Sequence, residues 1–346
     1  MIRLIKDHLV KFFLIIGVLI LDIAVIFLAL IKTDQEISCP GGLDEVKSLI
    51  KTDSNTVLKG SFNTIYVYGI DEASILQTWI ALLADYNEIE EMNPSFHLSK
   101  EEMNTSGRLL KTYSIETSIL CAYLTANKID QSIDIEAKLM GYTVYNRQIN
   151  HKTFKIGDLI TQIYSISDKA LYDAASGNLA KALNNLTIGD IVTVIRDGKT
   201  LEITFNENIS SDNQNHFYCF YKYDINEESA KPKFTIYPSN NQGSSGGLLQ
   251  TLSVYSQITG IDLTNGLKVC GTGTINLSGK VGEIGSVSQK IVTAIHNKAD
   301  IFLCPSDNYE EAYATYKKTP GHKKMKLIEV STLEEAIWKL GKYYES

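Results

Sequence analysis

The residues best suited to chemistry lie in the stretch GSSGG at positions 243–247, where Ser245 fits the G-x-S-x-G pattern of a hydrolase nucleophile turn. Apolar residues with helical spacing follow directly, so Ser245 is predicted to lie at the N-terminus of a helix. The backbone N–H groups at such a terminus can stabilise an oxyanion or bind a phosphate. The stretch alone is compatible with a hydrolase elbow, a phosphate-binding loop or the serine of a serine–lysine protease.

The hydrolase elbow is the weakest of these interpretations. It requires a strand that runs directly into the serine, followed downstream by an acid and a histidine. The preceding sequence FTIYPSNNQG is interrupted by Pro238 and several polar residues, and only His296 and His322 follow the serine. His296 is expected at the surface end of a helix over 288–298, where it would not reach Ser245.

Lys290 is the second candidate residue, in the segment GSVSQKIVTA at positions 285–294. Gly285 and Ser286 are predicted to open a helix that carries Lys290 in its first turn. The positive end of the helix dipole and burial beside Ile291 would both disfavour the charged ammonium and lower the lysine pKa. A neutral lysine near Ser245 could accept the hydroxyl proton. The alternative is a solvated surface lysine.

Three blocks of sequence, in this order, resemble the proteolytic domain of the Lon family. GSSGG corresponds to the family's G-P-S-A-G serine loop, GTGTINLSGKVGEIG to its T-G-x-I-x-x-x-G-x-V-x-x-I-G hairpin, and SVSQK to its lysine segment. ADIFLCPSDN then resembles the family's next strand and its Pro-x-x-Asn ending. The chain resembles most of all the membrane-anchored, PDZ-containing Lon-like proteases of Gram-positive bacteria.

The resemblance implies a role for each matched residue. Ser245 would be the nucleophile and Lys290 the general base, while the hydroxyl of Thr272 would help to orient the lysine. The loop on the oxyanion side would consist of Gly243, Ser244 and Gly246. Two positions depart from the family pattern, because Ser244 stands in place of proline and Gly246 in place of alanine. Both departures predict a more flexible loop.

The N-terminal segment is predicted to anchor the chain in a membrane. The twenty residues Phe12–Ile31 are apolar except for one aspartate, and about 20 such residues cross a bilayer as a helix. Lys32-Thr33-Asp34 follows instead of the small residues of a cleavage site, so we expect an uncleaved single-pass anchor. The basic residues before the span predict a cytoplasmic N-terminus and an extracytoplasmic catalytic domain at the cell membrane.

A near-repeat marks a separate domain. KIGDLI at 155–160 and TIGDIV at 187–192 each place a Gly-Asp turn before a strand, and RDGK at 196–199 has the composition of a hairpin turn. The segment between them, DKALYDAASGNLAKALNN, is predicted to supply a helix. The arrangement resembles a PDZ domain of the bacterial protease type over residues 140–207. Such a domain could hold a peptide or serve as a spacer or gate.

The predicted fold class is α+β, with a Lon-type proteolytic domain of the ribosomal protein S5 domain 2-like kind. A strand over 58–69 and helices over 73–86 and 115–127 resemble the opening of that fold, so the PDZ-like domain would be inserted within it. The last third alternates strands over 267–275, 301–304 and 327–330 with helices, the final one opened by a capping box over 331–334. The expected divisions are the anchor 1–33, a connector 34–53, the N-terminal part of the protease fold 54–139, the PDZ-like domain 140–207 and the catalytic domain 208–346.

Composition and motifs argue against several other functions. The net charge of −7 and the lack of a basic run make nucleic acid an unexpected partner. The five cysteines form no C-x-x-C, so neither a metal nor a disulfide framework is indicated. Gly198-Lys199-Thr200 imitates the end of a nucleotide-binding loop, but Thr193 stands where that motif needs glycine. No nucleotide or other cofactor is expected.

The leading hypothesis is an ATP-independent, membrane-anchored serine–lysine endopeptidase that cleaves flexible or unfolded polypeptides outside the membrane. The resemblance also implies a homo-oligomeric ring. One alternative is a non-cleaving Lon-like, PDZ-containing binding protein that recruits client polypeptides. A second is a small-molecule kinase, because some such kinases have G-S-S-A phosphate loops on a related fold, but the anchor and the Lys290 block are foreign to them.

Overall fold

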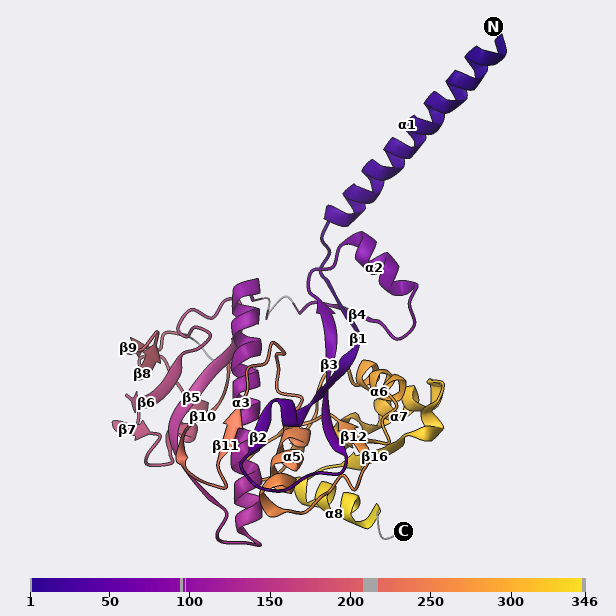
Figure 1. Ribbon diagram of the computed structural model, residues 1–346. Coiled ribbons are helices and arrows are strands. Elements are labelled where there is room, and N and C mark those ends of the chain that lie inside the picture. The colour runs from indigo at the N-terminus through magenta and orange to yellow at the C-terminus, as the bar shows by residue number, and fades with distance from the viewer. Residues whose placement is uncertain (1, 94–95, 97, 208–216, 344–346) are drawn as a thin grey trace. The chain divides into compact units, whose positions relative to one another are not determined.

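The computed structural model describes residues 2–93, 96, 98–207 and 217–343 (Figure 1). The chain forms two compact units. The first comprises Met1–Gly41 and Val67–Met92, and the second comprises Gly42–Tyr66 and Asn93–Ser346.

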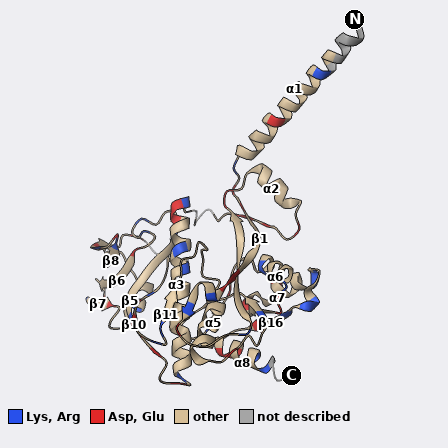
Figure 2. Ribbon diagram, viewed as in Figure 1, with Lys and Arg blue, Asp and Glu red and all other residues tan. Residues whose placement is uncertain are grey.

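The first unit contains the apolar N-terminal helix α1 (Ile2–Leu30). Its segment Lys11–Leu30 has a mean hydropathy of 3.1 and is not covered by other residues, so it is long and apolar enough to be a transmembrane span or a signal sequence. Figure 2 shows how few charges this part of α1 carries. Helix α2 (Ile75–Leu82) begins with a capping box formed by Ser74 and Gln77. The first residues of β1 (Gln35–Glu45) pair with β4 (Glu88–Glu91).

A parallel sheet forms the centre of the second unit, in the order β16-β15-β12-β3. Parallel strands are covered on both faces, which is why a run such as IFLCP is buried at every position. The strands are β3 (Ser61–Ile70), β12 (Lys268–Gly271), β15 (Ile301–Pro305) and β16 (Lys326–Val330).

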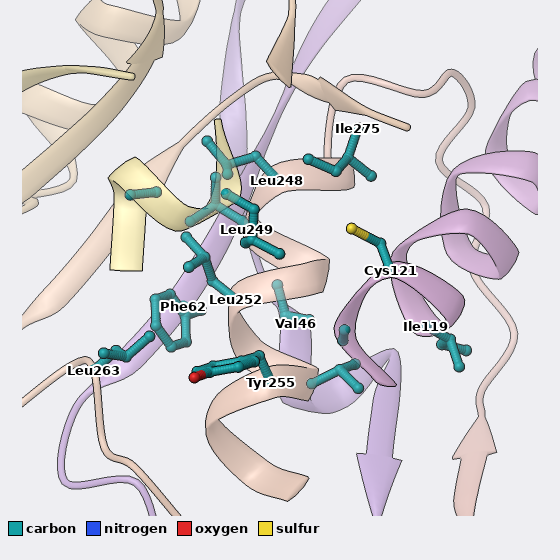
Figure 3. Close-up of a cluster of buried hydrophobic side chains, with 14 of the residues drawn as sticks. Val46, Phe62, Ile119, Cys121, Leu248, Leu249, Leu252, Tyr255, Leu263 and Ile275 are labelled. Atoms are coloured by element: carbon teal, nitrogen blue, oxygen red, sulfur yellow. The ribbon is translucent and has the colours of Figure 1, made fainter. Parts of the chain in front are cut away.

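Helices cover the two faces of this sheet, and alternate strand residues meet different helices. Val269 and Leu303 belong to the same buried cluster as Leu249 of α5 (Figure 3). Their neighbours Cys270 and Phe302 pack in a second cluster with Ile291 of α6. The first face is covered by α3 (Lys100–Asn127), α5 (Gly247–Thr259) and α8 (Leu333–Tyr343), and the second by α6 (Val287–His296) and α7 (Tyr309–Lys318).

Residues 134–207 and 217–231 form an antiparallel sheet with its own hydrophobic core, in the order β10-β5-β6-β8-β9. The two Gly-Asp turns occur as predicted. Gly157 and Gly189 have φ of +95° and +98°, and the carboxylates of Asp158 and Asp190 accept the N–H groups of residues 155 and 187. The predicted hairpin turn at 196–199 joins β8 and β9. The elements are β5 (Asp134–Arg147), β6 (Leu159–Ser165), β7 (Ala170–Asp173), α4 (Leu179–Asn184), β8 (Ile191–Arg196), β9 (Lys199–Thr204) and β10 (Phe217–Lys231).

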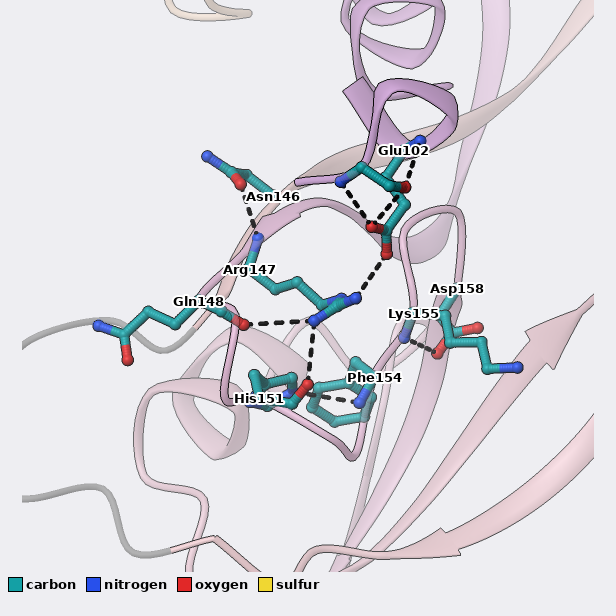
Figure 4. Close-up of polar contacts among 9 residues, drawn as sticks. Glu102, Asn146, Arg147, Gln148, His151, Phe154, Lys155 and Asp158 are labelled. Carbon is teal, nitrogen blue, oxygen red and sulfur yellow. Dashed lines mark hydrogen bonds and ion pairs between the residues drawn. The ribbon is translucent and has the colours of Figure 1, made fainter. Parts of the chain in front are cut away.

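A polar network joins the end of β5 to the first turn of α3 (Figure 4). The Arg147 guanidinium pairs with Glu102 and also donates to the carbonyls of Gln148 and His151. Glu102 in turn completes the capping box that starts α3 at Ser99. One arginine therefore fixes the helix start, the strand end and the loop that follows the strand.

Several local predictions were wrong. The expected connector over 34–53 contains β1 and β2 (Ile50–Thr52), and β2 pairs with β11 (Phe234–Ile236). Gly42 lies in β1, where a side chain would collide with Tyr66, so glycine allows close approach within a sheet.

Three further differences concern helices. Helix α3 begins at Lys100, well before the predicted helix start at residue 115. The helix expected over residues 168–185 is reduced to α4, because β7 occupies its first part. The cap of α8 lies one residue later than predicted, since Thr332 accepts the N–H of Glu335, whose carboxylate accepts the N–H of Ser331. A short hairpin of β13 (Thr274–Ile275) and β14 (Val281–Gly282) connects β12 to α6.

The sheet contacts make a prediction about a fragment. Residues 208–346 lack β3, which pairs with β12, and α3, which packs against α5. We expect this fragment to show no cooperative thermal transition by circular dichroism, because the edge of β12 and one face of α5 would be exposed to solvent. Residues 34–346 serve as the control and should unfold cooperatively. A soluble 208–346 fragment with a sharp transition would contradict the inserted arrangement.

Candidate active site

Ser245 is half-buried in the turn immediately before α5. Its carbonyl accepts two hydrogen bonds, one of 3.1 Å from the Thr272 hydroxyl and one of 2.8 Å from the N–H of Gly273. Both donors follow the last residue of β12 directly. The serine is therefore fixed to the carboxyl end of a central strand, and Thr272 contacts the serine backbone.

The residues before Ser245 are fixed to one face of α3. The N–H of Gly243, whose φ is +85°, donates to the Gly107 carbonyl over 3.0 Å. The Ser114 hydroxyl donates to the Ser244 carbonyl over 3.2 Å. Positions 107 and 114 are seven residues apart and share one side of the helix. The loop is therefore held by hydrogen bonds on both sides, although its sequence predicted greater flexibility.

The buried side chain of Gln250 packs beneath the same loop. Its Oε1 accepts from the hydroxyls of Ser114 at 3.1 Å and Ser118 at 3.3 Å. Its Nε2 is buried and has no hydrogen-bond partner among the described residues. A Cβ at position 246 would lie 2.9 Å from this Nε2 and 2.9 Å from the methyl group of Thr64. The close approach explains why Gly246 stands where the Lon pattern has alanine.

The backbone of the turn offers donors to an incoming oxygen. The N–H of Gly247 donates to the Ser244 carbonyl, and that of Leu248 to the Gly273 carbonyl. The N–H groups of Ser245 and Gly246 have no acceptor within the described part of the chain. Donors of this kind at a helix N-terminus can stabilise negative charge that develops on a carbonyl oxygen.

Lys290 is buried in the first turns of α6, with only 4% of its surface exposed. Burial lowers the pKa of its ammonium group from 10.5 to about 8. Its Nζ donates to the Gly285 carbonyl over 3.1 Å. The surface-lysine alternative is therefore wrong, and a substantial fraction of this amine is neutral close to physiological pH.

Asn308 fixes the loop that leads into α6. Its side-chain amide accepts the N–H of Ile284 and donates to the carbonyl of the same residue, both at 2.9 Å. Asn308 is itself buried and ends the Pro-x-x-Asn segment noted in the sequence. This paired contact holds the backbone just before Gly285, whose carbonyl receives the Lys290 hydrogen bond.

The serine loop and the start of the lysine helix lie at one edge of the sheet, on opposite faces. The loop before α5 is hydrogen-bonded to Thr272 and Gly273, directly after β12. Helix α6 connects β12 to the parallel strand β15, so its N-terminus also lies toward the carboxyl end of β12. In the described residues, no hydrogen bond joins Ser245 Oγ to Lys290 Nζ. The hydrogen bond to Gly285 uses an N–H of the amine and leaves the lone pair of a neutral lysine free, so proton transfer requires only that Ser245 Oγ and Nζ come within hydrogen-bond reach.

Other nucleophiles and metal ligands at this edge are disfavoured. Burial raises the thiol pKa of both Cys270 and Cys304 to about 12, which keeps them protonated. Within the described ranges, no group of three or more His, Cys, Asp or Glu side chains could hold a metal ion. His296 is exposed at the last residue of α6, as predicted.

Comparison with known proteins agrees with this arrangement. Residues 183–340 match the family of the Lon protease (S16) C-terminal proteolytic domain. Lon protease of Neorickettsia sennetsu is 30% identical over 99 residues, which cover 29% of this chain and 12% of that protein. The chain thus matches only a small part of that relative's length. Ser245, Thr272 and Lys290 all lie in the matched region.

Proposed function

We propose that this protein is a membrane-anchored serine–lysine endopeptidase that cleaves flexible or unfolded polypeptides without ATP. The observation that carries the proposal is the buried amine of Lys290, whose pKa of about 8 suits a general base, at the sheet edge that also holds the Ser245 loop. Ser245 is the proposed nucleophile, and Thr272 positions it through its backbone carbonyl.

The proposed reaction has two balanced steps. The lone pair of neutral Lys290 accepts the Ser245 hydroxyl proton, and the serine oxygen attacks the peptide carbonyl carbon. The N–H groups of Ser245 and Gly246 stabilise the oxyanion, the C–N bond breaks, and the lysine gives its proton to the leaving amine. Lys290 then takes a proton from water, and the hydroxide attacks the acyl carbon. The bond between that carbon and the serine oxygen breaks, Lys290 returns its proton to the serine oxygen, and the acid product is released.

Two properties of the chain support ATP independence and membrane anchoring. The segment Gly198-Lys199-Thr200 belongs to the β8–β9 hairpin, in which Lys199 pairs with Arg196, so its geometry is not that of a phosphate-binding loop. Without a nucleotide-driven unfolding step, accessible polypeptides are the fitting substrates. The apolar helix α1 would span the cell membrane with its N-terminus in the cytoplasm and the catalytic domain outside.

The remaining parts of the proposal concern organisation. Residues 140–207 would form a PDZ-like domain inserted in the protease fold, with its own core and its flanking strands β5 and β10 paired. The domain could hold a peptide or act as a spacer or gate. The catalytic domains would assemble as a homo-oligomeric ring.

The second candidate function is a non-cleaving binding protein that recruits client polypeptides. It is favoured by one observation, namely that no hydrogen bond joins Ser245 Oγ to Lys290 Nζ in the described residues. If the two atoms stayed apart with substrate bound, Ser245 would lack a base.

Cleavage of casein by the full chain distinguishes these two functions. We expect Ser245→Ala and Lys290→Ala each to lower the rate by about 10³-fold or more, because each removes one half of the reacting pair. Below pH 7 the wild-type rate should fall about tenfold per pH unit, since only the neutral form of a base with a pKa of about 8 accepts the serine proton. Lys280→Ala, at an exposed lysine, is the control. Equal cleavage by wild type and Ser245→Ala would eliminate the protease.

The buried amide under the loop makes a separate prediction. Gln250→Met keeps the side-chain volume but removes the acceptor of the Ser114 and Ser118 hydroxyls. The hydrogen bonds that link α3 to the residues beneath the loop are then lost. We expect kcat to fall about tenfold, the effect of ~1.4 kcal/mol, with KM little changed.

Gln257→Met is the matched control for this variant. Gln257 lies about two turns further along α5 and is equally buried, but its Oε1 bonds to Thr52 at the other end of the helix. Both variants should lower the melting temperature, whereas only Gln250→Met should lower kcat. Equal losses of kcat in both would show that Gln250 acts through general stability alone.

A further inference from the structure

Helix α2 and the residue after it expose large apolar side chains to solvent. Trp79 is 54% exposed, Ile80 57%, Leu82 69% and Leu83 87%. The helix ILQTWIAL carries no charge (Figure 2). Clustered apolar exposure of this kind marks a surface that contacts a partner or a membrane.

The start of α2 is hydrogen-bonded to the end of α1. The N–H of Ile75 donates to the Ile31 carbonyl over 3.1 Å, and the N–H of Thr33 donates to the Ala73 carbonyl over 2.9 Å. The Thr33 hydroxyl donates to the same carbonyl over 2.7 Å. These contacts lie within the first unit and hold α2 at the point where the apolar segment of α1 ends.

This position restricts what the apolar surface can meet. If α1 crosses a bilayer, residues 31–33 lie at its boundary, and eight helical residues extend about 12 Å from there. Interfacial helices bury an apolar face to a depth of about 5–10 Å between headgroups and acyl chains. Tryptophan is enriched in that zone because its ring is apolar and its indole N–H is polar.

We propose that α2 is a membrane-contact surface, in which Trp79, Ile80, Leu82 and Leu83 insert into the bilayer interface beside the emerging end of α1. The proposal rests on α1 being a transmembrane span, which is part of the proposed function. It commits to lipid as the partner because α2 is joined directly to the segment that would lie in the bilayer.

The charges near α2 indicate that the contact is apolar rather than electrostatic. The surrounding part of the unit is acidic, and Glu36 directly faces Glu90 across the β1–β4 pair. Burial, Glu90 and Asp71 together raise the pKa of the Glu36 carboxyl. An acidic surface is not attracted to anionic headgroups, so the insertion should proceed equally well in zwitterionic lipid.

Tryptophan fluorescence of the full chain in proteoliposomes tests the proposal. The sequence has two tryptophans, so Trp338→Phe leaves Trp79 as the single reporter and Trp79→Phe gives the background from Trp338. With phosphatidylcholine brominated high in its acyl chains, we expect Trp79 to lose at least about half of its emission relative to unbrominated lipid. Trp79 emission that does not respond to the bromines would overturn the proposal.

Two matched variants in the Trp338→Phe background separate insertion from mere proximity. Replacing Leu83 by serine should weaken the quenching, because it removes an apolar group from the same surface. Leu124→Ser, at an exposed leucine of α3, should leave the quenching unchanged. Quenching that depends on added anionic lipid would contradict an apolar contact. A blue-shifted Trp79 emission that depends on protein density, without quenching, would indicate a second copy of the chain and would also overturn the proposal.

Carbonate extraction of the same vesicles distinguishes failure of the anchor from failure of the surface. Protein that stays in the membrane while Trp79 is unquenched would refute only the α2 contact. Protein that is washed off would refute the transmembrane role of α1 and the α2 proposal with it, while casein cleavage would still report separately on the catalytic site.

Discussion

Burial of one amine, that of Lys290, is the interaction on which the proposed catalytic site depends. The Lys290 side chain is 4% exposed on α6, and desolvation brings the pKa of its amine to about 8. The folded state thus binds fewer protons than the unfolded state between pH 8 and 10.5. Below pH 8 the amine is charged in both states, and its burial lowers the free energy of unfolding by roughly 3 kcal/mol. This destabilisation disappears as the pH rises to 10.5, where the amine is neutral in both states. A stability loss of this size is typical of groups that are kept for function.

The serine side of the site is organised by a different principle. Its backbone carbonyls are fixed by donors from two directions, from Thr272 and Gly273 at the end of β12 and from Ser114 on α3. The α3 contact lies outside the region that matches the Lon proteolytic domain. Residues before β5 therefore hold the loop that follows β10 and β11. This is the physical reason to regard the two flanking segments as one folded structure.

The sequence predicted the features that depend on local patterns. Ser245 does precede a helix, the Gly-Asp turns and the hairpin at 196–199 occur, and Lys290 is buried in the early part of α6. Patterns spread over distant segments were missed. Nothing in the local sequence of Ser114 or Gln250 predicts that they meet, because they are 136 residues apart and touch only through packing of α3 on α5. The segment over 34–53 was misassigned because its strands β1 and β2 pair with β4 and β11, which lie far away in the sequence.

The most direct test of the central claim is a titration of Lys290 itself. In protein labelled with ¹³C at lysine Cε, the Lys290 resonance can be assigned by its loss in Lys290→Gln and followed between pH 6 and 11. The buried general base described above predicts a midpoint about two units below the usual lysine pKa of ~10.4. A midpoint near 10.4 would mean a solvated, fully charged amine at neutral pH, and the proposed proton transfer from Ser245 would then have no acceptor.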